Sequence, residues 1–184
     1  MRVLGIDPGS HKTGWGAIEV DGNLVRHVDN GVIFLDDDRD LTVRLVDLTH
    51  RLRDRLVELH PDVVVVEDVF VRKGARSALI LGQARGVVLA TCGMQGLPVR
   101  SVPTSQVKLR VTGHGRAGKT QVAEMVRALL GLPELPFEDA ADALAVALCC
   151  VGDVERPAAP KAPVKRRAHG RDALLALARA QGKA

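Results

Sequence analysis

The sequence has few aromatic residues, few cysteines and no long apolar run, and these scarcities narrow the class of protein. No apolar run approaches the 18 or more residues that a membrane-spanning helix requires, and Asp7 interrupts the apolar N-terminus before a signal peptide could form. The three cysteines, Cys92, Cys149 and Cys150, lie in apolar, helical-looking surroundings without metal-ligand spacing, which disfavours a disulfide framework. At 184 residues the chain suits one domain with its own core, and we expect a soluble, cytoplasmic protein without a membrane partner.

The net charge of +4 hides an uneven distribution of charge along the chain. Residues 72–127 carry ten lysines and arginines against one acid, Glu124, whereas residues 1–71 and 128–152 are acidic. A basic middle between acidic flanks indicates a surface for a polyanion beside a cluster of acids. Helices that simply alternate solvated charges would give a similar asymmetry, so charge alone does not establish this interpretation.

The pattern of apolar residues predicts strands separated by helices. Asp21-Gly22 is a strong hairpin signal between two strand-like runs, and the run Val63–Val66 is typical of a strand buried on both faces. Leucines at helical spacing begin at Leu41, and His60-Pro61 ends that helix. We expect strands near 2–6, 14–20, 24–34, 63–66 and 98–102, and helices near 41–59, 75–95, 119–131 and 138–151. The predicted fold class is α/β, with a mixed five-stranded sheet that begins with an antiparallel hairpin and is flanked by helices.

The composition of the chain changes after Gly152. Residues 156–163 contain three prolines and three alanines, and the basic run Lys165-Arg166-Arg167 follows. Such a segment is typical of a linker, although residues 172–180 could form a short amphipathic helix. We predict one folded domain over residues 1–152 and a basic, Pro/Ala-rich, mobile tail over residues 153–184.

Two of the predicted strands end in a carboxylate, the first at Asp7 and the four-valine strand at Glu67. Sites in open α/β sheets gather at the carboxyl ends of strands, so neighbouring parallel strands would place these two acids side by side. Adjacent unpaired carboxylates repel each other, and a divalent cation removes that repulsion. Either acid could instead cap the turn that follows it, which explains one strand-end acid as well but a pair of them less well.

A third group of acids lies on the predicted helix that begins near Glu138. Asp139 and Asp142 are three residues apart and share one helix face, and the alanines around them let the helix approach another surface closely. Acids in a first helical turn also complement the helix dipole, which accounts for Glu138 and Asp139 better than for Asp142. Together with Asp7 and Glu67, this pair could hold two Mg²⁺ ions about 4 Å apart, an arrangement used to cleave phosphodiesters.

Residues 113–120 match the G-x-x-x-x-G-K-[ST] phosphate-loop pattern in full, with residues 108–111 as a candidate preceding strand. A phosphate-loop NTPase also needs a later apolar strand that ends in an acid and helps to hold Mg²⁺. No such strand follows Thr120, and the remaining 64 residues are too few to build the rest of that fold. A basic, glycine-rich loop that holds DNA phosphates fits the same residues better.

The basic middle of the chain supplies candidate DNA contacts. Its lysines and arginines would bind phosphates and give a salt-dependent affinity without reading base sequence. Phe70 follows Glu67 by three residues and is one of only four aromatic residues, so it is a candidate to insert between unpaired bases or to wedge a distorted junction. A core position under the loop would explain Phe70 equally well. The candidate DNA-binding residues are Phe70, Arg72, Lys73, Arg76, Lys108, Arg116 and Lys119.

Seven motifs follow one another along residues 1–152 in an order shared by one protein family. They are Gly5-Ile6-Asp7-Pro8-Gly9, Thr13-Gly14-Trp15-Gly16, Val66–Phe70, Leu81–Val87, Pro103 with Gln106–Lys108, the 113–119 loop with Gln121-Val122, and Asp139–Ala145. In these motifs the chain resembles RuvC, the bacterial crossover-junction endodeoxyribonucleases. The resemblance implies an RNase H-like fold, a homodimer, Mg²⁺-dependent nicking of Holliday junctions, and the RuvA–RuvB branch-migration complex as partner.

The resemblance also implies roles for individual residues. The family's catalytic, metal-binding acids fall on Asp7, Glu67, Asp139 and Asp142. Its DNA-contacting lysines fall on Lys108 and Lys119, and its junction-facing aromatic residue falls on Phe70. One position departs from the pattern, because family members often carry Gln after the second acid and this chain has Asp68. This fifth carboxylate either perturbs metal binding or faces away from the site.

The resulting hypothesis is a structure-selective endonuclease that resolves Holliday junctions in homologous recombination and DNA repair. Symmetric nicking of two strands, with two Mg²⁺ per active site or Mn²⁺ as a substitute, would leave 5′-phosphate and 3′-hydroxyl ends. Three alternatives stay open: a junction-binding module that does not cut, a nuclease of the same fold that acts on RNA, and an ATP-handling protein. The last includes an actin-like kinase, because Asp7-Pro8-Gly9 followed by Thr13-Gly14 also resembles the phosphate-binding hairpin of those kinases. The chain is, however, too short for the two lobes that such kinases need.

Overall fold

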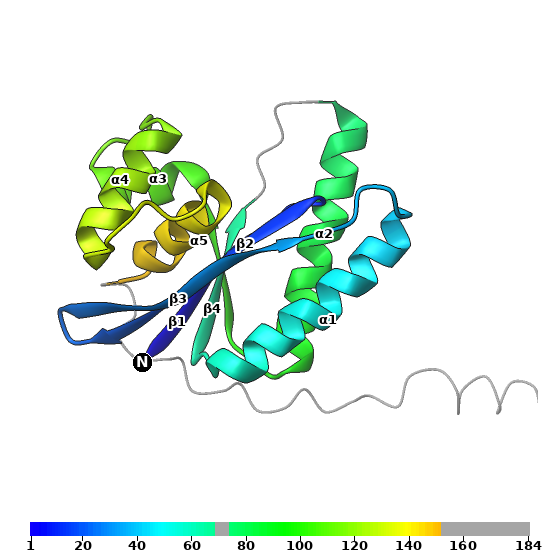
Figure 1. The fold of residues 1–184 in the computed structure, drawn as a ribbon, viewed down its shortest axis with the longest axis horizontal. Coiled ribbons are helices and arrows are strands. Elements are labelled where there is room, and N and C mark those ends of the chain that lie inside the picture. The colour runs from blue at the N-terminus through cyan, green and yellow to red at the C-terminus, as the bar shows by residue number, and fades with distance from the viewer. Residues whose placement is uncertain (69–73, 152–184) are drawn as a thin grey trace, which may run out of the picture.

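A computed structural model describes residues 1–68 and 74–151 of the chain. It contains a five-stranded sheet with the strand order β3-β2-β1-β4-β5 (Figure 1). β1 and β4 pair in parallel, as do β4 and β5, whereas β2 pairs antiparallel with both β1 and β3. The strands are β1 (Arg2–Asp7), β2 (Lys12–Asp21), β3 (Leu24–Phe34), β4 (Val63–Asp68) and β5 (Val99–Pro103). The predicted mixed sheet with an initial antiparallel hairpin is confirmed.

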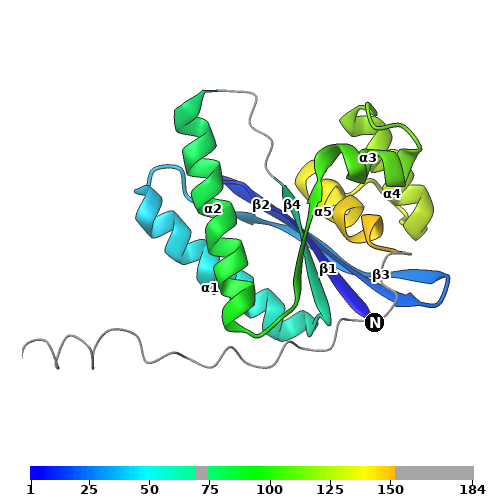
Figure 2. The same ribbon diagram turned by 180° about the vertical axis from the view of Figure 1, so that it is seen from behind.

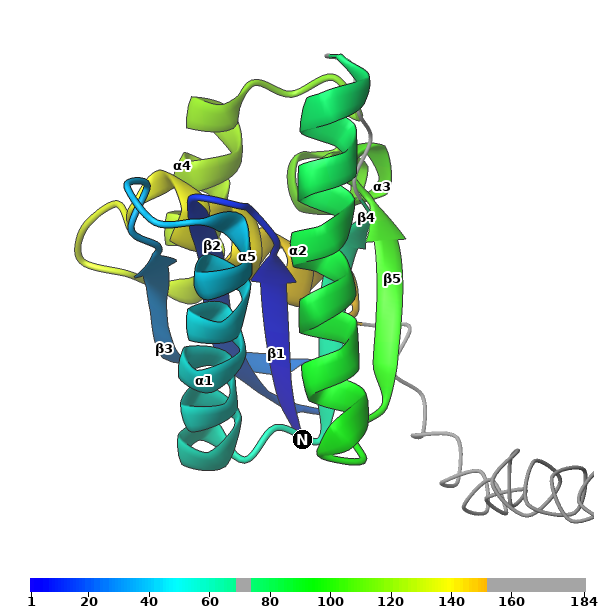
Figure 3. The ribbon, with the colours of Figure 1, turned by 90° about the vertical axis from the view of Figure 1, so that its right-hand side faces the viewer.

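Helices cover both faces of this sheet. α1 and α2 lie on one face and α3, α4 and α5 on the other, as the ribbon shows from the front, from behind and from the side (Figures 1, 2 and 3). Their bounds are α1 (Leu41–Leu59), α2 (Ala75–Met94), α3 (Thr104–Thr112), α4 (Lys119–Leu130) and α5 (Glu138–Cys149). Because successive side chains of a strand point to opposite faces, Val63 and Val65 pack with α5, while Val64 and Val66 pack with α1 and α2.

α5 lies directly against the sheet because three glycines on β1 and β2 leave room for its backbone. A Cβ added at Gly5 would lie 2.1 Å from the carbonyl oxygen of Ala143, and one at Gly14 would lie 1.9 Å from that of Asp139. At Gly16 the same atom would lie 2.6 Å from the side chain of Leu144. Both distances to backbone are far below a van der Waals contact. The glycines therefore fix the height of α5 above the strand ends.

The segment after β5 differs from the sequence-based prediction. Residues 104–112 form the helix α3, which was not predicted, and Lys108–Val111 is helical instead of the strand that the phosphate-loop alternative requires. Only Val107 and Val111 of α3 are buried, so its apolar periodicity covers a single turn and its β-branched residues suggested a strand. The phosphate-loop alternative loses its preceding strand, which argues against that class of NTPase.

α2 is long and apolar enough to cross a membrane by length and composition alone. In the fold it packs beside α1, and its buried residues are Ala84, Val88, Thr91 and Cys92. Its mid-helix Arg85 binds groups at the ends of β4 and β5. α2 therefore covers part of the core of the protein, and its buried face accounts for part of its apolar composition.

Three of the candidate DNA-binding residues, Phe70, Arg72 and Lys73, lie outside the described residues. So does the predicted tail over 153–184.

Candidate active site

Asp7 and Glu67 lie side by side at the carboxyl ends of β1 and β4. The register of this parallel pair joins Ile6 to Val66, so the next residue on each strand is one of the two acids. Gly5 and Val65 both face α5, and the alternation of side chains turns Asp7 and Glu67 to the same face. They lie close enough that Glu67 contributes to the raised pKa of Asp7. The two strands are thus the parallel neighbours that the sequence led us to expect.

The first two turns of α5 bring the other acids to this pair. Gly14, the antiparallel partner of Asp7, lies beneath the backbone of Asp139. Asp142 is one turn further along the helix, and its side chain is 23% exposed. One pocket is lined by Asp7, Glu67 and Asp142 from the acids, and by Thr104, Val107, Lys108, Lys119 and Val122 from α3 and α4. Asp139 stands beside this pocket, where its charge acts on Asp7.

The crowding of carboxylates changes their titration. Burial, together with the charge and hydrogen bond of Glu67 and the charges of Asp142 and Asp139, raises the pKa of Asp7 from 3.8 to about 9. Burial also raises the pKa of Asp142 to about 6, although the nearby Lys119 opposes the shift. Raised pKa values of this size show that bringing these acids together in one pocket costs folding free energy. Clusters of this kind are typical of functional sites.

Lys119 is one of the two lysines that line this pocket, and Glu138 is its ion-pair partner. Lys119 is the first residue of α4, and its ammonium group lies 3.6 Å from a carboxylate oxygen of Asp142. The same ammonium group donates a short hydrogen bond to Glu138, which raises the pKa of Lys119 and lowers that of Glu138. The sequence pattern explained Glu138 by the helix dipole. Its ion pair with Lys119 joins residues 19 apart and carries no signal in the sequence.

The remaining described candidates for DNA contacts lie around this pocket or beyond it. Lys108 lines the pocket from α3, whereas Arg116 is exposed in the loop between α3 and α4. Arg76 is exposed in the first turn of α2. The structure thus brings Lys108 and Lys119 together with three of the four acids, and it does not bring Arg76 or Arg116 into the pocket lining.

The donor set of the pocket fits a hard divalent cation. All four acids offer carboxylate oxygens, the ligands that Mg²⁺ prefers, and their mutual repulsion is relieved by positive charge. Within residues 1–68 and 74–151, however, no three His, Cys, Asp or Glu side chains are arranged closely enough to ligate one ion. Ligation of one ion by three of these side chains would require them to lie closer together, whereas two carboxylates with water ligands would suffice for Mg²⁺.

The family model of RuvC, the crossover junction endodeoxyribonuclease, matches residues 3–150. The chain belongs to the RuvC family. The RuvC of Trichlorobacter lovleyi is 49% identical over 170 residues, which cover 91% of this chain and 96% of that relative. The RuvC of Citrifermentans bemidjiense is 52% identical over 149 residues, with 81% of this chain and 91% of the relative covered.

Among solved structures, Thermus thermophilus RuvC in complex with a Holliday junction substrate matches with a TM-score of 0.76 and 35% sequence identity. The match covers 82% of this chain and 93% of that chain. The RNase H-like, mixed α/β class that the sequence implied for this RuvC chain is confirmed by these neighbours and by its own sheet order.

Asp68, where this RuvC chain departs from the Gln that we associate with the family, faces away from the acids. It follows Glu67 on β4 and therefore points to the opposite face of the sheet. There Arg85 of α2 donates a hydrogen bond of 2.6 Å to its carboxylate, and further ones to Ser101 at 2.6 Å and to the carbonyl oxygen of Glu67 at 3.2 Å. Of the two alternatives for Asp68, the structure supports the one in which it faces away from the group of acids. Arg85, which belongs to the basic segment, thus links α2 to β4 and β5 by hydrogen bonds.

Proposed function

We propose that this chain is a metal-dependent endonuclease that resolves four-way DNA junctions by nicking two strands symmetrically. The observation that carries the proposal is the single pocket in which acids from two strand ends and one helix meet two lysines. Its relatives are named crossover junction endodeoxyribonucleases, and a structural neighbour was solved with a Holliday junction. We infer the same substrate for this chain, in recombination and DNA repair.

We propose Asp7, Glu67, Asp139 and Asp142 as the ligands and catalytic acids, with two Mg²⁺ expected per site and Mn²⁺ as a substitute. When bound, the metal ions supply an activated water and positive charge for the leaving 3′ oxygen. The protein's own part begins with Asp7, which must lose its proton before it can act as a ligand, because its pKa lies near 9 without metal. Cleavage would leave a 5′-phosphate and a 3′-hydroxyl.

The two lysines of the pocket would bind and orient the scissile strand. Lys108 lines the pocket from α3, and Lys119 lines it from the first turn of α4. A phosphate group that enters between them and the acids meets positive charge on one side and carboxylates on the other. Glu138 keeps the Lys119 ammonium close to Asp142 until DNA competes for it. We propose Arg76, Arg116 and, outside the described residues, Phe70, Arg72 and Lys73 as further DNA contacts.

Symmetric nicking requires two copies of the site, and we propose a two-fold homodimer. The outer face of α2 supports this. A Cβ added at Gly82, Gly86 or Gly93 would meet nothing within 4 Å in the described chain, although each glycine lowers helix propensity by about 1 kcal/mol relative to alanine. Leu79 and Met94 on the same helix are 64% and 72% exposed. Small residues between exposed apolar ones allow two copies of a helix to pack closely.

The remaining proposals concern the setting of the reaction. We propose the cytoplasm as the compartment and the RuvA–RuvB complex as a partner, as the family resemblance implies. We also keep residues 1–152 as the nuclease domain, with residues 153–184 as a separate basic tail.

The proposed function is tested by cleavage of a labelled four-way junction beside a matched linear duplex and an RNA–DNA hybrid. Each substrate is incubated with Mg²⁺, with Mn²⁺ and with EDTA, and Asp7→Asn serves as the inactive control. We expect paired, symmetric, metal-dependent nicks in the junction alone. Junction binding without nicks would favour a binding module, cleavage of the hybrid alone would favour an RNA nuclease, and either result would overturn the proposal.

A further inference from the structure

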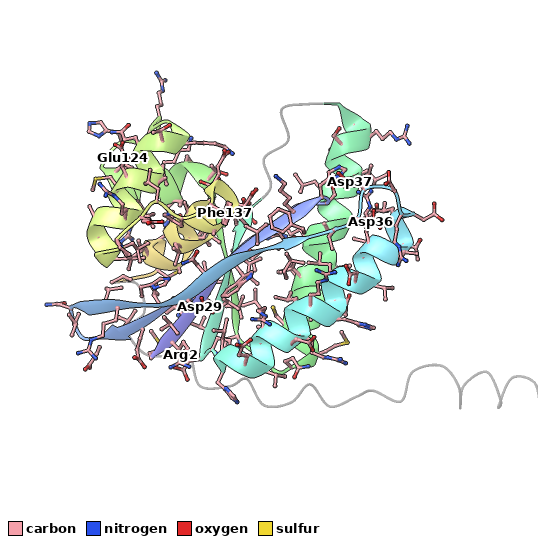
Figure 4. The ribbon with its side chains drawn as sticks, viewed as in Figure 1. Arg2, Asp29, Asp36, Asp37, Glu124 and Phe137 are labelled. Atoms are coloured by element: carbon pink, nitrogen blue, oxygen red, sulfur yellow. The ribbon has the colours of Figure 1, made fainter. Side chains whose placement is uncertain are left out.

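Three side chains at the catalytic edge of the sheet have no role in the site described above. Lys12 begins β2 and pairs in register with Phe34, the last residue of β3. Phe137 immediately precedes α5 (Figure 4). All three lie on the β3 side of Asp7, whereas Lys108 and α3 lie on the β5 side.

These side chains share the face of the sheet that carries the acids. Gly14 points toward α5, so Lys12, two residues earlier on the same strand, points to the same face. The Lys12 ammonium group lies 5.6 Å from the centre of the Phe34 ring, which places Phe34 on that face as well. A Cβ added at Gly14 would lie 1.9 Å from the carbonyl oxygen of Asp139, so Phe137, two residues before Asp139, lies near the same end of β2 as Lys12.

The two phenylalanines are exposed to a degree that the fold does not require. Phe34 is 53% exposed and Phe137 is 74% exposed, whereas Trp15 is only 6% exposed. Exposed single apolar residues are common on protein surfaces. Here, however, two of the four aromatic residues of the chain lie at the edge of the sheet that carries the acids, and Lys12 lies over the ring of one of them, Phe34. Two ring faces and one ammonium group are the combination that binds bases and a phosphate of a nucleic acid strand.

The distances along the sheet suit a strand that passes through the active site. Adjacent β-strands lie about 4.8 Å apart, so Phe34, two strands from β1, lies roughly 10 Å from the line of Asp7. That span equals about three nucleotides at the 3.4 Å rise of one DNA strand. A cleaved strand extends from the scissile phosphate in both directions, and Lys108 of α3 lies on only one of them, the β5 side.

Two of the acidic residues after β3 are paired with basic side chains. Asp37 is hydrogen-bonded to His11 and lies 3.5 Å from Arg44, and Asp36 lies 3.6 Å from Arg39. Leu35 is buried in the core on the α1 face, so the chain turns toward that face after Phe34. Figure 4 shows Asp36 and Asp37 above α1, away from Phe137.

We propose that Lys12, Phe34 and Phe137 form a second DNA-binding surface, which holds the flank of the cleaved strand on the β3 side of the active site. The phenylalanine rings stack on bases that are unpaired near the branch point, and Lys12 contacts a phosphate between them. This inference rests on the proposed junction substrate and extends it, because it assigns a separate surface to each flank of the cleaved strand.

The test uses the full chain in EDTA and junctions that carry 2-aminopurine at single positions within four nucleotides on either side of the cleavage point. We expect the wild-type chain to quench the probe strongly on one flank, through stacking. Phe34→Ser and Phe137→Ser should each restore the fluorescence there and weaken junction binding about tenfold. Phe137→Trp should keep the quenching, and Lys12→Ser should lower the slope of log affinity against log salt by about 1.

Leu24→Ser is the matched control, because Leu24 is 50% exposed at the opposite end of β3. If the wild type cuts junctions but both phenylalanine variants bind and quench as Leu24→Ser does, this inference is overturned and the proposed function stands. If the wild type neither binds nor cuts junctions, the proposed function is overturned together with the inference. Circular dichroism of each variant separates a lost contact from a lost fold.

Discussion

The ammonium group of Lys119 lies 3.6 Å from a carboxylate oxygen of Asp142, although 23 positions separate the two residues in the sequence. α4 and α5 meet at their first turns, and this contact places a cation at the edge of the acidic pocket. Lys119 therefore balances the charge of the acids while DNA is absent. We expect it to become available to a DNA phosphate when a cation binds the acids.

Replacing this lysine should weaken DNA binding through the loss of one electrostatic contact with a phosphate. For Lys119→Ala we expect weaker junction binding and a slope of log affinity against log salt that is shallower by about 1, because one phosphate contact is lost. Fluorescence anisotropy over a series of salt concentrations measures both quantities. Arg53→Ala is the control, since Arg53 is 54% exposed on α1, on the other face of the sheet. An unchanged slope would mean that Lys119 touches no phosphate.

The raised pKa of Asp7 predicts how the stability of the metal-free protein depends on pH. A carboxyl group whose pKa rises from 3.8 to about 9 on folding favours the folded state while it is protonated. That contribution is complete below about pH 3.8 and is lost as the pH rises through about 9. Asp7→Asn cannot ionise, so in EDTA its melting temperature should exceed that of the wild type by several degrees at pH 8–9 and match it near pH 4. Parallel melting curves across this range, measured by circular dichroism, would contradict the coupling.

Because α5 contacts the sheet so closely, adding a single methyl group at Gly14 should lower both the stability of the protein and its rate of cleavage. Gly14→Ala forces a Cβ to within 1.9 Å of the Asp139 carbonyl oxygen unless α5 moves. We expect a loss of about 1–3 kcal/mol in unfolding free energy, as for other overpacked sites, and cleavage below a tenth of the wild-type rate. Gly118→Ala is the control, because its Cβ would meet nothing within 4 Å. It should cost less than about 1 kcal/mol as a poorer helix cap. A Gly14→Ala variant as stable and active as the Gly118→Ala control would show that α5 does not depend on a close contact with Gly14.

Two arginines of α2 should have separable roles. Arg85 fixes the ends of β4 and β5, so Arg85→Ala should slow cleavage while junction affinity stays within about threefold of the wild type. Arg76, exposed in the first turn, should show the opposite pattern when replaced by alanine, with weaker binding and near-normal cleavage at saturation. Single-turnover rates and binding titrations on one junction distinguish the two. Equal effects on both quantities in both variants would contradict this division.

The outer face of α2 can be tested through the oligomeric state. Gly86→Gln places a long side chain where the proposed homodimer needs close helix packing, and we expect a monomer by sedimentation. Ser77→Gln, at an exposed position earlier on the same helix, should leave the dimer intact. A Gly86→Gln chain that still sediments as a dimer would place the interface elsewhere.

The sequence predicted those features that depend on local pattern. The four-valine run and the acid after it predicted both β4 and the position of Glu67, and the Asp21-Gly22 turn predicted the β2–β3 hairpin. Alanine-rich residues around Asp142 predicted a closely packed helix, and α5 is such a helix. In each of these cases the signal lies within a few residues of the feature.

Features that depend on distant contacts were not predictable in the same way. The pairing of Glu138 with Lys119, and of Arg85 with Asp68 and Ser101, forms only when separate elements pack together. The close contact between Gly14 and α5 also cannot be predicted until it is known that the backbone of Asp139 packs against this glycine. α3 escaped notice because two buried valines four residues apart are too short a pattern to identify a helix.

The seat of α5 on β1 has a consequence for synthesis of the chain on the ribosome. Asp7 and Glu67 emerge early, but the pocket is complete only when residues 138–142, from the far end of the matched region, have folded back onto the first two strands. A nascent or truncated chain that ends before α5 carries two of the four acids and lacks the helix that completes their pocket. Under the proposed assignment of the four acids, we expect cleavage activity to arise only after α5 has folded onto β1 and β2, and an unfinished chain to leave DNA uncut.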